Sequence, residues 1–464
     1  MGVMHQTIQN GPMEHRPPPV QGPSWGRRMR FAFRRRNMLR FLSEIATDYG
    51  DASRFRVRHA DYWFFTHPDA IRDVLVTHDE RFIKGPALRR AKATLGEGLL
   101  TSEGDLHRRQ RRLVQPVLHP NRVASYADAM TAYAAQTADA WRDGQEIDLH
   151  AQMMHLTLRI VAKTLFDADL AAQVDGIGHA MDVSVGMFAR AMSPWGPLLN
   201  VLPLPSNFRF RREWGRLMTL IDRFIQDRRA NDTGRDDLLS RLLRATDSEA
   251  GGAGGAMTDR QLRDEAITLF TAGHETTANA LTFTLYLLSQ HREVAQTLRE
   301  ELKQILGGRL PTAADVERLP YTRMVLSESM RLYPPAWALG RESTEAVTIA
   351  GHEVAAGSVV LLSQWVTHRD PRWWPEPQRF DPLRFSPENR AARPRWAYFP
   401  FGGGSRQCIG ESFAWMEAIV VLATLAQRWE MEYLAEQGVP GLRPLITLRP
   451  SGPVRMRLRS LTVA

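Results

Sequence analysis

The chain contains a single cysteine, Cys408, in 464 residues. One thiol excludes an intrachain disulfide framework, and it also excludes any zinc or iron–sulfur site that needs several thiolates from this chain. This composition is compatible with a reducing compartment, so we expect a cytoplasmic protein. Taken alone, a lone cysteine is usually a small buried hydrophobe, and its neighbours must supply any argument for chemistry.

Long apolar runs are missing from residues 1–26, which are polar and rich in proline. This excludes a signal peptide or a membrane anchor there, and we expect a mobile leader before one domain spanning 27–464. The basic stretch 27–36 could lie on an anionic membrane surface. A solvated entry to the first helix explains the same charges more simply.

Nucleic-acid-binding motifs are also absent. Lys and Arg number 60 against 51 Asp and Glu, and the resulting net charge of +9 should attract anionic partners. The arginines are nevertheless dispersed, and the chain has neither paired Cys/His finger spacing nor an aromatic RNA-binding motif. We therefore expect no nucleic-acid partner.

Helical patterning dominates the chain, and no internal repeat is visible. Alternation over 54–58 and 62–65 predicts a hairpin, and β-branched residues over 347–365 predict a second small sheet. The glycine run 251–255 follows no strand, so we interpret it as a loop and not a phosphate cradle. The fold class is therefore mainly α with a minor β portion. The longest predicted helices are 121–141, 149–166, 208–229, 258–290, 294–306 and 411–429.

The surroundings of Cys408 favour a ligand role. Glycines 402–404 precede it and allow the backbone to bend and a flat ligand to approach closely. The predicted helix 411–429 follows it, so amide donors and the helix dipole should favour a thiolate over a thiol. These features predict a single axial metal ligand.

The predicted helix 258–290 begins with Thr258-Asp259-Arg260-Gln261, which resembles a capping box. Its middle, 270–278, places a glycine, a glutamate and two threonines in an otherwise apolar run. Local rules broken at one spot often mark a functional site. A zinc-binding His-Glu-x-x-His motif is excluded because position 278 is alanine.

Three motifs carry a resemblance to a known family. The segment Phe401-Gly402-x-x-x-Arg406-x-Cys408-x-Gly410 resembles the haem-binding loop of the cytochrome P-450 superfamily, the haem-thiolate monooxygenases. Residues 272–277 resemble the family's oxygen-activation segment, and 328–331 its Glu-x-x-Arg motif. The resemblance covers about residues 27–464. It implies a single-domain cytochrome P-450 fold, with haem between the long oxygen-activation helix and the cysteine-loop helix.

The resemblance also implies the cofactor and its contacts. The cofactor would be haem b with the Cys408 thiolate as axial ligand, which favours cleavage of an O–O bond. Phe401 would pack beside the sulfur, and several cations would reach the propionates. Many family members have tryptophan where this chain has His107. The implied cofactor contacts are Cys408, Phe401, Gly402, Arg406, Gly410, Ala272, His107, Arg111 and Arg341.

Two further sets of residues take their roles from the resemblance. Thr276 would hydrogen-bond dioxygen or its water network, and Glu275 would help to deliver protons by general acid catalysis. Glu328, Arg331 and Arg379 would form a structural charge network beneath the cysteine loop, and such buried charges require full pairing.

The activity implied is insertion of one oxygen atom from O2 into a small apolar substrate, such as a fatty acid, terpene or steroid. Electrons would come from a separate ferredoxin or flavodoxin with its reductase, attracted by Arg108, Arg109 and Arg112. Two alternatives remain: a peroxide-driven, isomerising or coupling enzyme, and a haem-binding sensor or carrier. The acid–threonine pair argues against both. We expect substrate contacts at 85–100, 185–208, beside Ala272, after Pro335 and at 445–448.

Overall fold

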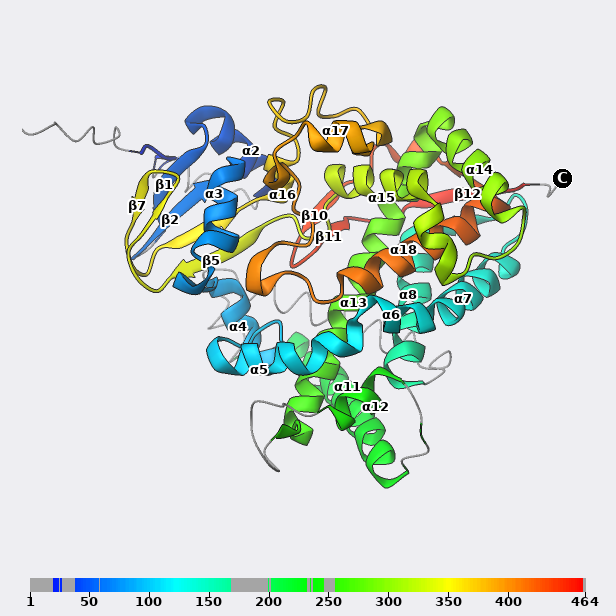
Figure 1. The fold of residues 1–464 in the computed structure, drawn as a ribbon, viewed down its shortest axis with the longest axis horizontal. Helices are drawn as coiled ribbons and strands as arrows, with labels where there is room; N and C mark the ends of the chain where they lie inside the picture. Colours follow the sequence, from blue (N-terminus) through cyan, green and yellow to red (C-terminus); the bar gives the residue numbers. More distant parts are fainter. Residues whose placement is uncertain are drawn as a thin grey trace, which may run out of the picture.

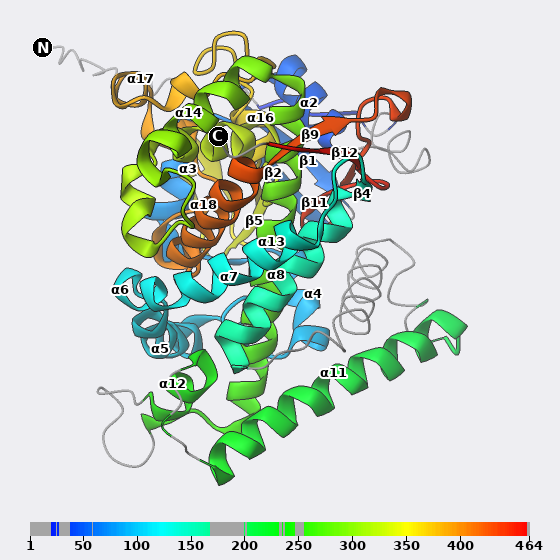
Figure 2. The same cartoon turned by 90° about the vertical axis from the view of Figure 1, so that its right-hand side faces the viewer.

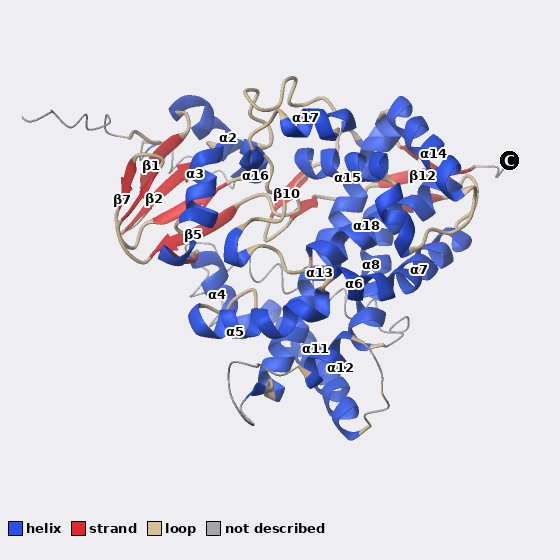
Figure 3. Ribbon diagram, viewed as in Figure 1, coloured by secondary structure: helices blue, strands red, loops and turns tan. Residues whose placement is uncertain are grey.

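The computed structural model describes residues 20–24, 26, 38–57, 59–167, 199, 202–231, 234, 237–245 and 255–461. The largest group of strands lies at one end of the molecule, and helices form most of the rest, with smaller groups of strands among them, as Figures 1 and 3 show. This arrangement confirms the mainly helical fold class. Most of the expected leader 1–26, the basic stretch 27–36, and large parts of 185–208 and 251–255 lie outside the described residues.

The β-rich end is built on a five-stranded sheet with strand order β1-β2-β8-β5-β3. The predicted hairpin is confirmed as β1 paired antiparallel with β2. Only part of the second predicted sheet forms, as the separate pair β6 (Val347–Ile349) and β7 (His352–Val354). The strands of the large sheet are Ala52–Val57 (β1), Ala60–Phe65 (β2), Phe82–Lys84 (β3), Leu339–Ser343 (β5) and Val359–Leu362 (β8).

Strand β8 corrects the prediction for 347–365. It joins the large sheet, parallel to β2 and antiparallel to β5, because its nearly continuous apolar sequence suits a central position. Two smaller sheets lie elsewhere. They have the orders β4-β12-β9 and β10-β11, with the strands Glu146–Asp148 (β4), Trp429–Tyr433 (β9), Leu442–Pro444 (β10), Leu448–Pro450 (β11) and Arg455–Ser460 (β12).

Helix α13 (Asp259–Gln290) runs through the middle of the molecule, as Figures 1 and 2 show. The predicted capping box is confirmed, since Thr258 accepts from the amide of Gln261 and the Gln261 side chain accepts from the amide of Thr258. The helix contacts the apolar faces of several others, so most of it is buried. The helices that contact it include α8 (Leu149–Phe166), α11 (Pro205–Ala230), α14 (Arg292–Leu306), α15 (Pro320–Leu332) and α18 (Glu411–Arg428).

The other helix predictions are confirmed to within a few residues, with one interruption. The helix expected over 121–141 is divided into α6 (Pro120–Val123) and α7 (Ala127–Ala140) by a short 3-10 turn. The remaining helices are α2 (Met38–Tyr49), α3 (Pro68–Arg72), α4 (Pro86–Leu95), α5 (Gly104–Val114), α12 (Leu238–Arg244), α16 (Gln364–Thr367) and α17 (Pro387–Ala391).

A single large apolar core joins α7, α8, α13, α15 and α18, and a smaller one lies beneath the five-stranded sheet. The segment that carries Cys408 leads from the sheet side into α18, on the helical side. In the described part of the chain, none of the helices combines the length and apolar character that crossing a bilayer requires.

Candidate functional site

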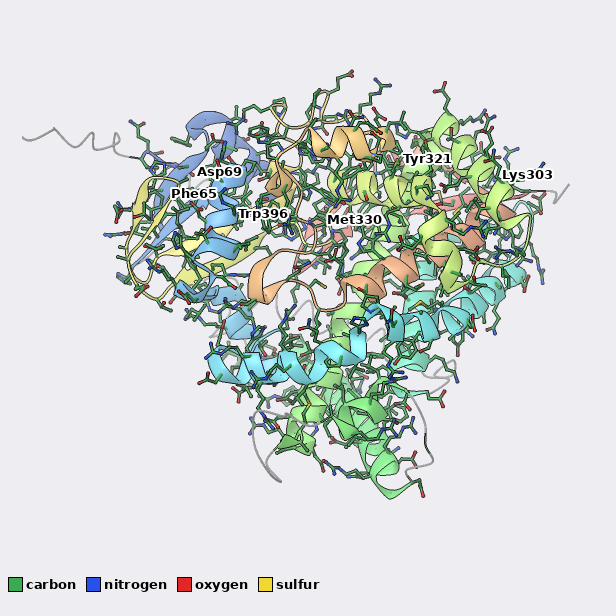
Figure 4. The ribbon with its side chains drawn as sticks, viewed as in Figure 1. Phe65, Asp69, Lys303, Tyr321, Met330 and Trp396 are labelled. Atoms are coloured by element: carbon green, nitrogen blue, oxygen red, sulfur yellow. The ribbon has the colours of Figure 1, made fainter. Side chains whose placement is uncertain are left out.

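The loop before α18 needs its glycines. Gly404 has a φ of +68°, and a Cβ there would lie 1.8 Å from the carbonyl oxygen of Leu75. A Cβ on Gly403 would lie 2.4 Å from the ring of Trp396, which Figure 4 shows near the β-rich end of the molecule. Both positions therefore exclude a side chain, and the loop is pressed against its surroundings.

Short contacts then fix the shape of the loop around Cys408. The amide of Cys408 donates to the carbonyl oxygen of Phe401 at 2.9 Å, and the Phe401 ring lies 5.9 Å from that of Trp415. Gly402 has a φ of +71°, in the left-handed region. Gly410 is the N-cap of α18, where a Cβ would stand 4.0 Å from the Cys408 sulfur. The loop thus brings both ends of the motif close to the thiol.

Cys408 is exposed, yet the protein packed around it desolvates the thiol. Burial raises the pKa of the thiol to about 11, while the amide of Gly410 and the charge of Arg111 lower it. The Gly410 amide at the start of α18 thus favours the thiolate as expected, but desolvation of the thiol outweighs it. A metal cation would reverse this balance.

A second accessible surface lies in the middle of α13. Ala272 is exposed and Thr276 is half-buried, while neighbours such as His274 and Thr277 are buried. The Thr276 hydroxyl donates to the carbonyl oxygen of Ala272 at 2.8 Å. Ala272 and Thr276 are four residues apart, so these accessible positions lie on one face of an otherwise largely buried helix.

Glu275 points to a different neighbour from Thr276. Its carboxylate is 3% exposed and accepts hydrogen bonds from the Arg449 guanidinium and the Thr447 hydroxyl. Burial raises the pKa of Glu275, but the hydrogen bond and charge of Arg449 and the Thr447 hydroxyl outweigh it, and the pKa is lowered. The two predicted catalytic residues are therefore adjacent in the sequence, but their side chains have different partners: Thr276 contacts the backbone of Ala272, and Glu275 contacts Arg449 and Thr447.

Basic side chains gather beside the cysteine loop. Arg111, on α5, donates to the carbonyl oxygen of Gln407 at 2.8 Å and carries its charge close to Cys408. His107 lies one turn earlier on α5 and is buried. Burial, together with the charges of Lys84 and Arg406, lowers the pKa of His107 to about 4, so the imidazole is neutral near pH 7.

Two arginines of this group differ in their partners. Arg406 is paired, because it contacts the carboxylates of Asp79 at 2.7 Å and Glu103 at 3.2 Å. Arg341 is buried, and its Nε has no hydrogen-bond partner while Nη1 reaches only the carbonyl oxygen of Gly340. Burial lowers the pKa of Arg341 to about 10, with the nearby charge of Arg406 contributing. A buried guanidinium of this kind needs an anion.

Glu328 and Arg331 form the predicted buried pair on α15. Both side chains are fully buried, and the guanidinium donates to the two carboxylate oxygens at 2.6 and 2.7 Å. Arg331 also donates to the backbone carbonyl oxygens of His368, Pro377 and Arg379. The pair therefore ties α15 to the irregular segment that precedes the cysteine loop.

The prediction that Arg379 supplies the third charge is wrong. The Arg379 side chain is exposed and pairs with Glu376, so only its backbone joins the network. Arg384 takes the place instead, since its Nε lies 3.4 Å from the Glu328 carboxylate and its side chain is largely buried. The two arginines stand on either side of Phe380, and the sequence did not reveal which one turns inward.

Two ionisable side chains from other elements, Lys84 and Glu265, hydrogen-bond to the backbone of the loop between α4 and α5, and the sequence did not reveal these contacts. Lys84 is buried and donates to the carbonyl oxygens of Leu99 and Ser102. Glu265, on α13, is fully buried and accepts from the amide of Leu99 at 3.0 Å, while its other oxygen has no hydrogen-bond partner. Neither residue belongs to a motif, because backbone partners leave no pattern in a sequence.

Glu265 should make stability depend on pH. Burial raises its pKa to about 7, against 4.5 for the ordinary carboxyl, while the Leu99 amide lowers it. Between these values the unfolded chain binds fewer protons, so stability falls as pH rises, by about 3 kcal/mol in total. Glu265→Gln should remove this fall in the urea unfolding midpoint between pH 4.5 and 7. Identical pH profiles for Glu265→Gln and the unmodified protein would contradict the expectation.

Comparisons with known proteins identify the family of the chain. The family model described as Cytochrome P450 matches residues 17–455. Cyclooctatin synthase of Streptomyces melanosporofaciens is 42% identical over 91% of each chain, and pentalenene oxygenase of Streptomyces avermitilis is 34% identical over 95% of each. A crystal structure of the cytochrome P450DA heme domain superposes with a TM-score of 0.83 at 25% identity, over 92% of this chain and 93% of that one. The chain belongs to the cytochrome P450 family of monooxygenases.

Proposed function

We propose that Cys408 is the axial thiolate ligand of haem b, and that the protein uses O2 to oxidise an apolar cyclic terpene. The observation that carries the proposal is the accessible Cys408 thiol, enclosed by a glycine loop and bordered by the cations of α5 and of the sheet. An iron centre would compensate the burial of this sulfur.

The charges beside the loop fit the cofactor. Four cations lie beside the loop: Arg406 pairs with Asp79 and Glu103, Lys84 and Arg341 lie near that pair, and Arg111 lies near Asp79 and Cys408. Since Arg406 is the cation that pairs with both carboxylates, Arg111 and Arg341 would be left for the two propionates of haem. Neutral His107 can add an N–H donor. The unpartnered Nε of Arg341 is the donor most in need of such an acceptor.

Bound haem would supply the reduction of O2 and the oxidation of the substrate. The chain would contribute the surroundings of that chemistry. Ala272 leaves room on the accessible face of α13, and Thr276 offers a hydroxyl oxygen there whose proton is already donated to Ala272. Glu275 is the carboxylate nearest in sequence and would take up protons and pass them toward Thr276.

The names of the relatives support the choice of substrate class. Their names, cyclooctatin synthase, cyclooctat-9-en-7-ol 5-monooxygenase and pentalenene oxygenase, describe oxidation of terpene skeletons, which favours a cyclic terpene over a fatty acid or steroid here. A spectral binding screen should give tighter dissociation constants for pentalenene and related cyclic terpenes than for a fatty acid or a steroid. Preferential binding of the fatty acid or the steroid would overturn the terpene assignment.

Electrons would come from a separate acidic protein, either a ferredoxin or a flavodoxin. The outward side of α5 supports this, because Arg108 and Arg112 are exposed close to Arg111 and the cysteine loop. Such a surface would steer an acidic partner toward the thiolate side of the site.

One spectrum tests the assignment of Cys408. The reduced, haem-loaded protein with carbon monoxide should show the red-shifted Soret band of thiolate ligation. A folded, haem-loaded protein without that band would overturn the proposal, and with it the monooxygenase mechanism at this site.

Arg341→Met tests the cofactor contact separately. The Arg341 guanidinium is buried without a salt bridge to a carboxylate of the described residues, so its charge is desolvated at a cost in stability. Replacing it by methionine removes that cost and should make the haem-free chain more stable. The same change should speed haem release about tenfold, which corresponds to the loss of about 1.4 kcal/mol from one charge-assisted hydrogen bond. Haem transfer to apomyoglobin measures the release rate, and urea unfolding of the haem-free chain measures the stability. Unchanged haem release would place Arg341 outside the propionate site.

A further inference from the structure

The loop between α4 and α5, residues 96–103, lies directly on α13. A Cβ on Gly98 would stand 2.1 Å from the hydroxyl oxygen of Thr268 and 2.5 Å from the backbone carbonyl oxygen of Asp264, so the approach requires glycine. The amide of Glu97 also donates to the Asp264 carboxylate, at 2.8 Å. At Gly98 the backbone of the loop therefore touches the helix with no side chain of the loop in between.

Glu265 is the carboxyl group beneath this contact. It is fully buried, one of its oxygens accepts from the Leu99 amide at 3.0 Å, and the other has no hydrogen-bond partner. A buried carboxylate needs an ion pair or several donors, and one amide is less than that. A protonated carboxyl can still accept from the same amide. The covered arrangement therefore suits the protonated form of Glu265.

The charges nearest to Glu265 also favour a neutral carboxyl. The negative charge of Asp264, its neighbour on α13, opposes ionisation, and the positive charge of Lys84 on β3 favours ionisation less strongly. The Lys84 ammonium instead donates to the backbone carbonyl oxygens of Leu99, at 2.8 Å, and of Ser102. Glu265 thus holds the loop at an amide, and Lys84 holds it at two carbonyl groups.

The titratable groups farther from Glu265 have other neighbours. In the loop, Glu97 pairs with Lys92 of α4. The groups that lie near Lys84 are Glu103, Arg406, Arg341 and His107. Burial raises the pKa of Glu265 to about 7, and it lowers the pKa of Lys84 to about 8 and that of His107 to about 4. Glu265 is therefore the first of these three to change charge as the pH rises above 5.

The contact lies on the same face of α13 as the proposed site. Positions 265, 268, 272 and 276 are three, four and four residues apart, so they share one face of the helix. Gly98 touches Thr268, one turn before Ala272, and the loop therefore borders the accessible positions Ala272 and Thr276. An apolar ligand bound over Ala272 would have this loop as its neighbour.

We propose that Glu265 is a positioning residue for the substrate: its protonated carboxyl holds the loop 96–103 against α13 beside Ala272, and loss of the proton loosens the loop and weakens substrate binding. The inference rests on the proposed monooxygenase function and adds a proton-dependent control on the substrate side. Glu265 touches neither cofactor nor substrate in this assignment. It acts through the backbone of Leu99, and its proton passes to water that enters when the loop opens.

The direction of the pH effect follows from the raised pKa of Glu265. The closed loop holds the proton up to about pH 7, whereas an exposed carboxyl releases it near 4.5. The hold is therefore complete below pH 4.5 and is lost as the pH rises through about 7.

The first test measures opening of the loop by hydrogen exchange of the haem-loaded protein. After correction for the intrinsic exchange rate, protection of residues 96–103 should fall at least about fivefold between about pH 5.5 and 7.5, a range below the pKa of Lys84. Glu265→Gln keeps an acceptor for the Leu99 amide and cannot ionise, so its protection should not depend on pH. Glu265→Met has no acceptor and should exchange rapidly throughout. Glu293→Gln makes the matched change at an exposed glutamate of α14 and should behave like the unmodified protein.

The second test asks whether the loop controls substrate binding. Pentalenene is the probe, because a terpene hydrocarbon does not titrate. Its dissociation constant, measured by spectral titration of the haem-loaded protein, should rise at least about threefold over the same pH range. Glu265→Gln should remove this rise, and Glu265→Met should bind pentalenene weakly throughout.

The outcomes separate this inference from the proposed function. Protection that does not change with pH in the unmodified protein overturns the control by Glu265. So does a pentalenene affinity that is the same in the unmodified protein and in Glu265→Gln, since a merely structural contact would behave in that way. Each variant is first checked for the carbon monoxide band. Absence of that band in the unmodified protein would reject Cys408 ligation, and absence of any spectral response to pentalenene would reject the terpene assignment, whereas hydrogen exchange would still decide whether Glu265 controls the loop.

Discussion

Replacing Cys408 by serine is expected to abolish the thiolate-type carbon monoxide spectrum and to lower monooxygenase turnover by at least about 100-fold, equivalent to about 2.7 kcal/mol of activation free energy. Serine keeps the size of the side chain, and the backbone contact from residue 408 to Phe401 remains available. The loss would therefore report on the sulfur and not on the loop. The measurements are the carbon monoxide difference spectrum and the product formed per mole of haem.

Gln407→Ala is the control for this experiment. Its side chain is exposed and contacts only Glu411 among the bonds described, while the carbonyl oxygen that accepts from Arg111 belongs to the backbone and is retained. The control should keep both the spectrum and most of the turnover. If Cys408→Ser kept the thiolate band, another ligand would have to be responsible.

Most helices could be predicted from the sequence because their signals are local. The capping box at Thr258 and the apolar run of α8 fixed helix positions to within a residue, since capping and burial act over three or four neighbours. Strand β8 was misplaced for the opposite reason. Its pairing with β2 and β5 depends on contacts between segments that are distant in the sequence. The residues Val359–Leu362 predict a strand, but they do not show which strands it pairs with.

The motif residues of the site could be identified by resemblance, but several of their partners could not. Lys84 and Glu265 act on backbone groups, which carry no sequence signal. Arg449 had a weak signal: a glutamate within the apolar run of α13 requires a cation somewhere, and Arg449 is an arginine within the buried strand β11. Without the fold, many other arginines could have met that requirement.

Removing the carboxylate of Glu328 is expected to have the largest effect on stability. Glu328→Ala leaves the guanidinium of Arg331 fully buried with backbone carbonyls as its remaining partners, and breaking a buried pair in this way costs about 3–5 kcal/mol. Because Arg331 also holds the segment before the cysteine loop, we expect the variant to fail to retain haem. Haem content after purification and the urea unfolding midpoint are the measurements.

The arginines around Glu328 provide matched controls. Arg379→Ala removes an exposed side chain paired only with Glu376, so it should change stability by less than about 0.5 kcal/mol and leave haem content intact. Arg384→Ala removes the largely buried cation 3.4 Å from Glu328 and should be intermediate. The order Glu328, Arg384, Arg379 is therefore the expected order of haem loss. If Arg379→Ala lost more haem than Arg384→Ala, Arg379 and not Arg384 would supply the third charge of the network. Normal haem content in Glu328→Ala would show that the network does not support the cysteine loop.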